Sequence, residues 1–200
     1  MTARQKRGCA LIAAGLVLIL CAVGMQLMEQ KQDELAGENA KILLRQLQLD
    51  RVTLNLQDDP QQEQTTDADS FDMPVKQYLG YDLIGTIRLS DLGIELPVLN
   101  TWSDALLNVA PCRYAGSLTK ENMILMGHNY KNHFYPMLRA QVGMEVEFED
   151  VYGQIHHYRI AEIVTLRDSD GELLASDYPL TLFTCTVGGQ NRFVVRCVKE

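Results

Sequence analysis

The chain has 200 residues, 46% of them hydrophobic, and a formal net charge of -8 at pH 7. This length and composition allow one ordinary hydrophobic core but not two large ones, so we expect one domain with appended segments. The acidic balance provides no surface suited to phosphate groups, and no nucleic acid partner is expected.

The N-terminal segment predicts a membrane anchor. Basic residues within positions 4–7 precede an uncharged apolar stretch at positions 8–25, and acidic residues follow within positions 29–34. As a helix, the apolar stretch would span roughly 27 Å, close to the hydrocarbon thickness of a bilayer. This charge pattern favours a cytoplasmic N-terminus and an extracytoplasmic remainder, in a single-pass protein of the cell membrane. A cleavable signal peptide is the alternative, because positions 22–24 offer a fair cleavage site.

The cysteines do not form the pattern of a disulfide framework, and they are Cys9, Cys21, Cys112, Cys185 and Cys197. Two lie in the predicted membrane segment and the other three form an odd set, so at least one extracytoplasmic thiol stays unpaired. An exposed thiol outside the cell is prone to oxidation, which makes it a candidate for reactivity. We expect Cys197, within a strand, to be buried and inert.

Three segments are predicted along the chain. Residues 1–28 form a cytoplasmic tip and membrane anchor, residues 29–74 a helical stalk with an acidic linker, and residues 75–200 the folded domain. The stalk is rich in strong helix formers. Residues 57–74 are polar, acidic and nearly free of aliphatic side chains, a composition that cannot collapse into a core.

The folded domain is expected to be mainly β. Short apolar or alternating runs predict strands within residues 83–89, 94–99, 122–127, 144–150, 154–166, 178–187 and 191–198. Seven or eight strands with little helix predict a closed or nearly closed β-barrel.

The last two predicted strands form a hairpin that brings Cys185 close to Arg192. Gly188 and Gly189 between them can adopt positive φ angles, as a tight turn requires. A guanidinium beside a thiolate lowers the thiol pKa and can later donate to an oxyanion. Arg196 shares a strand face with Arg192, but Arg192 is nearer the turn and therefore nearer Cys185. On the hairpin alone, a surface arginine beside a core cysteine fits equally well.

His128 follows a short buried strand directly, so it falls in a loop that a rigid scaffold can position. A cysteine and a histidine from different strand ends can act as nucleophile and acid/base partner in acyl transfer. A solvated loop histidine is the alternative. The remaining histidines, His133, His156 and His157, lack the spacing of a Zn²⁺ site.

Together these segments resemble the sortases, membrane-anchored cysteine transpeptidases of Gram-positive bacteria. TLFTC at 181–185 is similar to the T-L-x-T-C strand of the family, GHN at 127–129 to its histidine segment, and NRFVVRC at 191–197 to the strand that its arginine opens. The segments occur in the order of the family, and the resemblance extends over residues 81–198.

The resemblance implies an eight-stranded sortase-type β-barrel with short helices, preceded by the transmembrane helix and stalk. It implies a substrate class of secreted proteins that carry a C-terminal LPXTG-like sorting signal. Cys185 would attack the threonine carbonyl and form a thioacyl enzyme, His128 would act as acid and base, and Arg192 would stabilise the oxyanion. The acceptor would be an amine of a peptidoglycan crossbridge or of a pilin. No metal or other cofactor is expected, and the N-terminal helix would contact membrane lipid.

Some features leave the details open. Thr184 and Thr186 flank the cysteine and are candidate substrate-binding residues, although ordinary strand threonines would look the same. Carboxylates at positions 168, 170 and 172 could bind Ca²⁺, but a solvated turn is the expectation. The segment 110–117 departs from the pattern of many sortases and places Cys112 in a loop.

The subclass and the exact function also have alternatives. The connection 167–179 is too short for the long helical insertion of class B sortases, although GHNYKNHF is similar to that class. The competing functions are a hydrolytic cysteine peptidase and a non-catalytic, membrane-tethered β-barrel that only binds a ligand.

Overall fold

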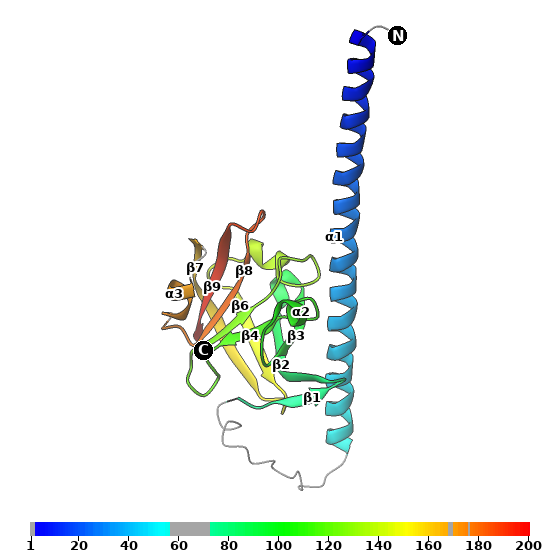
Figure 1. Cartoon of the computed structure of the whole chain (residues 1–200). Helices are drawn as coiled ribbons and strands as arrows, with labels where there is room; N and C mark the ends of the chain where they lie inside the picture. The colour runs from blue at the N-terminus through cyan, green and yellow to red at the C-terminus, as the bar shows by residue number, and fades with distance from the viewer. Residues whose placement is uncertain (1–2, 57–72, 168–169, 176) are drawn as a thin grey trace.

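A computed structural model describes residues 3–56, 73–167, 170–175 and 177–200 (Figure 1). Its helices are α1 (Ala3–Leu56), α2 (Asp104–Leu107) and α3 (Asp170–Leu174), with 3₁₀ turns η2 (Ser90–Leu92) and η3 (Tyr135–Arg139). Its strands are β1 (Lys76–Tyr78), β2 (Tyr81–Leu89), β3 (Ile94–Leu99), β4 (Cys112–Ala115), β5 (Met123–Met126), β6 (Glu145–Asp150), β7 (Ile155–Arg167), β8 (Leu180–Cys185) and β9 (Asn191–Lys199).

Eight of the strands close into a barrel, which confirms the fold predicted from the sequence. The order is β2-β3-β4-β5-β8-β9-β7-β6, and β6 pairs back onto β2. The β3–β4 and β5–β8 pairs are parallel, and the other pairs of the ring are antiparallel. Strand β1 lies outside the ring as a hairpin partner for the beginning of β2.

Strand β4 corrects the sequence-based expectation that Cys112 lies in a loop. Cys112 begins the strand, opposite Met126 of β5 and beside Leu99 of β3. Only four residues separate Pro111 from Gly116, too few to show an alternating pattern. The strand is therefore defined by its neighbours rather than by its own sequence.

The barrel closes where β2 passes β6, and the close approach there requires a glycine. Gly85 has a φ of 157°, and a Cβ atom added to it would lie 2.2 Å from the Glu149 carbonyl oxygen. Glu149 is buried, whereas Glu145 on the same strand is exposed and Glu147 is partly exposed. The Glu149 carboxylate forms an ion pair with Arg88 at 2.6 Å. The buried charge of Glu149 on β6 is thus balanced by Arg88 on β2, the strand that β6 meets where the barrel closes.

The barrel interior is filled by large apolar side chains, as the predicted strand patterns require. Fully buried examples include Phe134, Phe148, Met123, Leu125 and Leu182. Phe134 does not come from a strand, because it belongs to the loop between β5 and η3. This loop is therefore anchored in the main core.

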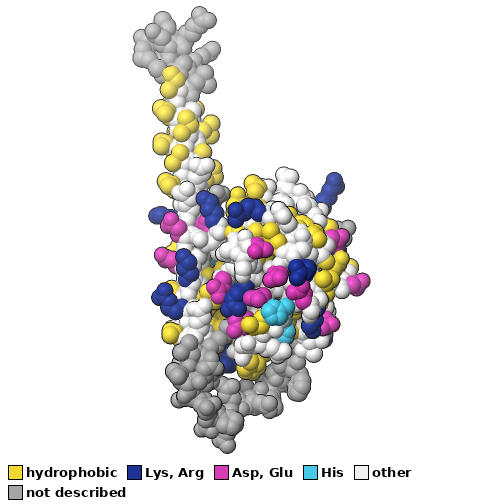
Figure 2. Space-filling view, turned by 180° about the vertical axis from the view of Figure 1, so that it is seen from behind, with side chains coloured by type: hydrophobic (Ala, Val, Ile, Leu, Met, Phe, Trp, Pro, Cys, Tyr) yellow, Lys and Arg dark blue, Asp and Glu magenta, His cyan; other side chains and the backbone are white. Residues whose placement is uncertain are grey.

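Helix α1 runs alongside the barrel and continues well beyond it (Figure 1). Ala36, Ala40, Leu43 and Leu47 lie on one helical face and are buried against the barrel. The N-terminal half projects beyond the barrel and carries apolar side chains (Figure 2). It is long and apolar enough, by length and composition, to cross a membrane. The turn between β8 and β9 lies at the barrel end nearer to this half (Figure 1). Most of the predicted linker, residues 57–72, lies outside the described residues.

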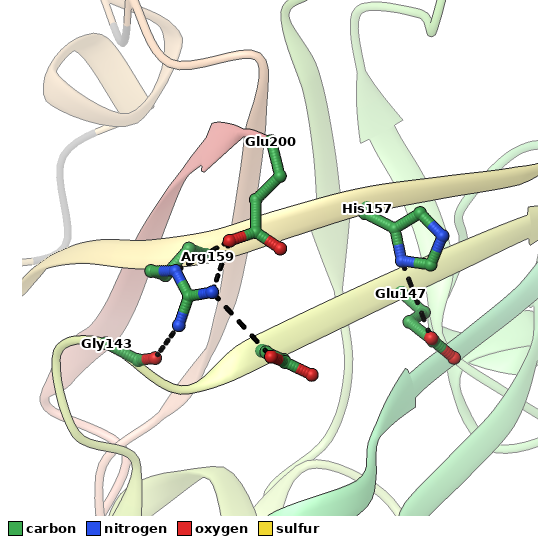
Figure 3. Close-up of polar contacts among 6 residues, drawn as sticks. Gly143, Glu147, His157, Arg159 and Glu200 are labelled. Atoms are coloured by element: carbon green, nitrogen blue, oxygen red, sulfur yellow. Dashed lines mark hydrogen bonds and ion pairs between the residues drawn. The ribbon is translucent and has the colours of Figure 1, made fainter.

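Polar contacts on the outer face of β6 and β7 tie the C-terminus to the barrel (Figure 3). Arg159 donates to the Glu200 carboxylate at 2.7 Å through Nε and to the Gly143 carbonyl at 2.9 Å. His157 lies 3.5 Å from Glu147 on the neighbouring strand. Because these side chains are partly exposed to solvent, each contact contributes little to stability.

Candidate active site

The β8–β9 hairpin places a guanidinium directly on the Cys185 thiol. Cys185 ends β8 and is the cross-strand partner of Arg192 near the start of β9. The Nη1 group of Arg192 donates to Cys185 Sγ over 3.0 Å. Gly188 and Gly189 in the turn have φ angles of 90° and 73°, a region open to glycine. The cysteine is partly exposed, so a substrate can reach it.

Arg196 lies too far along the same strand to contact the thiol. It is opposite Thr181, four residues before Cys185 on β8. Its guanidinium donates to Glu162 at 2.8 Å and lies over the Tyr178 ring. The cation at the cysteine is therefore Arg192.

The parallel pairing of β5 with β8 brings His128 to the level of Cys185. The last residue pair of this ladder is Met126 with Phe183, and the Gly127 N–H continues it by donating to the Phe183 carbonyl at 3.1 Å. His128 and Cys185 each lie two residues beyond that last pair. Among the described residues, no hydrogen bond joins the two side chains.

The loop that carries His128 is held in place by its own hydrogen bonds and by the core. The Phe134 N–H donates to the His128 carbonyl at 3.0 Å, and the imidazole stacks on Tyr130 with ring centroids 4.5 Å apart. A Cβ atom on Gly127 would lie 2.6 Å from the Phe134 ring. A glycine is therefore needed immediately before the histidine.

Burial lowers the pKa of His128, and the nearby Asp104 carboxylate opposes this shift in part. Burial disfavours the imidazolium because it removes water from the charge, whereas the carboxylate favours it. The net direction is downward, so the ring is neutral at neutral pH. A neutral imidazole can accept a proton from a nucleophile.

One cleft of about 410 Å³ contains all three of these side chains. Its lining consists of Trp102, Asp104, Leu107, Tyr114, Met126, Gly127, His128, Phe183, Cys185 and Arg192. Trp102 and Tyr114 have ring centroids 5.5 Å apart, and Tyr114 contacts Phe183 edge to face at 5.3 Å. The cleft thus combines a thiol, an imidazole and a guanidinium with an aromatic wall.

Comparison with known proteins agrees with this geometry. Residues 87–200 match the Sortase domain family, which is more than half of the chain. The chain belongs to the sortase family. It is therefore a cysteine transpeptidase, with the mainly β barrel of that family.

Solved sortase structures share the fold at low sequence identity. Sortase D5 of Clostridium perfringens is 18% identical, with 84% of this chain and 99% of that chain covered and a TM-score of 0.59. Sortase C1 of Streptococcus suis is 21% identical, with coverages of 59% and 73% and a TM-score of 0.53. A Clostridium perfringens sortase C, solved with the C-terminal cell wall sorting motif, is 21% identical, with coverages of 60% and 71% and a TM-score of 0.54. No curated protein sequence matches the chain significantly.

The two threonines beside the sortase cysteine do not line the cleft. Thr184 is buried, and its hydroxyl has no hydrogen-bond partner among the described residues. Thr186 belongs to the hairpin end, where its N–H donates to the Asn191 carbonyl at 2.9 Å and its carbonyl accepts from Asn129 at 3.4 Å. Their role as substrate-binding residues remains a prediction from the sequence.

The other barrel cysteines of this sortase are buried thiols. Cys112 and Cys197 are fully buried, and burial raises the pKa of each to about 12. The Cys112 thiol donates to the Ala110 carbonyl at 3.3 Å. Such thiols are poor nucleophiles, which leaves Cys185 as the partly exposed cysteine within the described barrel. The turn carboxylates at 168, 170 and 172 lie outside the residues whose side chains the structure describes.

Sequence reasoning missed four residues that shape the site: Trp102, Asp104, Tyr114 and Tyr130. Trp102 lies between β3 and α2, Asp104 begins α2, Tyr114 lies on β4, and Tyr130 lies in the histidine loop. Trp102 is the single tryptophan of the chain, which is the one local signal that could have drawn attention to this segment. Their convergence depends on barrel closure, which no local pattern reveals.

Proposed function

We propose that this sortase cleaves a C-terminal LPXTG-like sorting signal and joins the protein to an amine of the cell wall or of a pilin. The observation that carries the proposal is the 3.0 Å contact between Arg192 and Cys185, in a cleft that His128 also lines. A thiol, a cation and an imidazole at one cleft are the groups that acyl transfer through a thioester requires.

In the first step, the Cys185 sulfur attacks the carbonyl carbon of the threonine in the signal, and the thiol proton passes to His128. The oxyanion that forms accepts hydrogen bonds from Arg192, which already lies at the sulfur. The C–N bond then breaks, and His128 gives its proton to the departing amine. The product is a thioester on Cys185.

In the second step, the acceptor amine attacks the thioester carbonyl. The new C–N bond forms, the C–S bond breaks, and the proton lost by the amine passes through His128 to the Cys185 sulfur. The lowered pKa of His128 suits this step, because a neutral imidazole is available as the base. Holding both partners in one cleft supplies much of the acceleration.

The proposal places the chain in the cell membrane as a single-pass protein. Residues 1–28 would be the cytoplasmic tip and anchor in contact with lipid, residues 29–74 the stalk and linker, and residues 75–200 the extracytoplasmic catalytic domain. The support is the apolar N-terminal half of α1 and the basic residues before it. The substrates would be secreted proteins that bear the signal.

The products of a peptide library test the proposal. The full chain in detergent micelles is incubated with LPXTG-type peptides and triglycine, and the products are identified by mass spectrometry. We expect peptides joined to triglycine, none of them with Cys185→Ala, and a rate reduced about 10² to 10³-fold with Arg192→Ala. Arg196→Ala is the matched control, with an arginine removed from the same strand.

The competing functions give different products. Cleaved peptide without joined triglycine at any triglycine concentration would indicate a hydrolytic peptidase. If a folded chain cleaves no member of the library, the proposed reaction is refuted. The remaining alternative is then a non-catalytic β-barrel that only binds a ligand.

A further inference from the structure

Asp104 is the carboxylate that lines the catalytic cleft, and it is exposed. Within the described part of the chain, this carboxylate forms no hydrogen bond or ion pair, although its charge acts on His128. The permanent cation of the lining, Arg192, is already engaged with Cys185. The cleft therefore presents one uncommitted negative charge on the side of the histidine.

The segment that carries Asp104 is held firmly at its beginning. The Ser103 hydroxyl accepts a hydrogen bond from the Leu106 N–H at 3.2 Å and caps helix α2. Before it, Arg113 donates to the Asn100 carbonyl at 3.0 Å and to the Asn100 side chain at 2.8 Å. Trp102 precedes Ser103 and Asp104 follows it, so these hydrogen bonds hold both residues in place.

The end of the same segment is tied to the histidine loop. The Tyr130 hydroxyl donates to Asn108 at 3.2 Å, and Asn108 directly follows α2. The ring of Tyr130 stacks on His128. Because α2 spans only one turn, these bonds keep Asp104 near the imidazole.

We propose that Asp104 and Trp102 bind the ammonium form of the acceptor amine and hold it beside His128. This inference rests on the proposed function, since only an amine acceptor gives the subsite a ligand. Amines are mainly protonated at neutral pH, and a carboxylate attracts that charge. The indole of Trp102, 46% exposed, offers a face for a cation.

The subsite also accounts for the protons of the second step. The bound ammonium gives one proton to neutral His128, which passes it to solvent through the open cleft. The free amine then attacks the thioester, and the proton released as the C–N bond forms passes through His128, neutral again, to the Cys185 sulfur as the C–S bond breaks. Asp104 stabilises the imidazolium formed on the way, because its charge favours the protonated ring.

Competition between a charged and an uncharged nucleophile tests the subsite. The full chain in micelles is acylated with a sorting-signal peptide and then offered triglycine and hydroxylamine together, the second being uncharged at neutral pH. We expect Asp104→Asn to lower the ratio of triglycine product to hydroxylamine product about fivefold. Trp102→Leu should lower it in the same direction, Asp104→Glu should restore part of it, and Asp91→Asn, an exposed aspartate outside the cleft, should leave it unchanged.

Each other outcome overturns the inference. An unchanged ratio in Asp104→Asn would show that the carboxylate does not select a charged acceptor. Equal losses of both products would show that Asp104 acts on His128 alone. The mass of the protein before nucleophile is added separates these results from failure of the proposed function, because absence of any thioester on Cys185 would refute the function and the subsite with it.

Discussion

Replacing Leu47 by alanine tests whether α1 is part of the folded unit. Leu47 is fully buried on the face of α1 that packs against the barrel, in a cluster with Leu99, Leu107 and Val109. A Leu→Ala change at such a site removes the transfer free energy of the side chain and leaves a cavity, so we expect a loss of about 3 kcal/mol. Leu107 of the same cluster also lines the catalytic cleft.

The assay is denaturant unfolding of the full chain in detergent micelles, followed by the fluorescence of Trp102, the single tryptophan. The matched control is Leu49→Ala, which removes a leucine that is 54% exposed on the same helix. We expect the control to change stability by no more than about 0.5 kcal/mol. Equal effects of the two substitutions, or no loss for Leu47→Ala, would refute the packing of α1 on the barrel.

Three further results are expected. Burial lowers the pKa of His133 to about 4, although the Ala36 and Val109 carbonyls and the Asp33 charge oppose this shift. The same histidine has a pKa of about 6.5 in the unfolded chain, so the unfolded chain binds more protons between about pH 6.5 and 4. The free energy of unfolding should therefore fall by about 3 kcal/mol as pH drops through that window. In His133→Gln the denaturant midpoint should depend less on pH, whereas the control His157→Gln, at an exposed histidine, should keep the wild-type dependence. Gly127→Ala should cost about 1–3 kcal/mol in thermal or denaturant unfolding and slow thioester formation, because its methyl group meets an aromatic ring; wild-type rates would contradict this. Peptide mapping after alkylation of the native chain should find Cys112 unmodified, and its labelling at the rate seen in denaturant would contradict its burial.

Local patterns predicted the hairpin end of the site well. The apolar run of β8, the Gly-Gly turn and the apolar run of β9 fix an antiparallel register, so the nearness of Cys185 and Arg192 follows from sequence. The same reasoning favoured Arg192 over Arg196, which the structure finds paired with Glu162. Strands β1 and β4 were missed because they have only three or four residues and lack the continuous apolar run that marked the equally short β5.

Contacts between distant segments could not be predicted in this way. His128 and Cys185 meet through a parallel pairing of β5 with β8, and only the family resemblance, not periodicity, linked them beforehand. Asp104 reaches the same cleft through barrel closure and two side-chain hydrogen bonds. The packed face of α1 was likewise invisible, because its helical pattern suits an isolated stalk as well as a docked helix.

In the proposed mechanism, Cys185 carries the acyl group between two substrates. The most direct test of this role is the intact mass of the full chain in micelles after mixing with an LPXTG-type peptide, followed by addition of triglycine. We expect a gain in protein mass equal to the N-terminal acyl part of the cleaved peptide, mapped to Cys185. This added mass should disappear as joined peptide forms. A folded chain that cleaves the peptide without this adduct, or that carries the adduct on another residue, would contradict the mechanism.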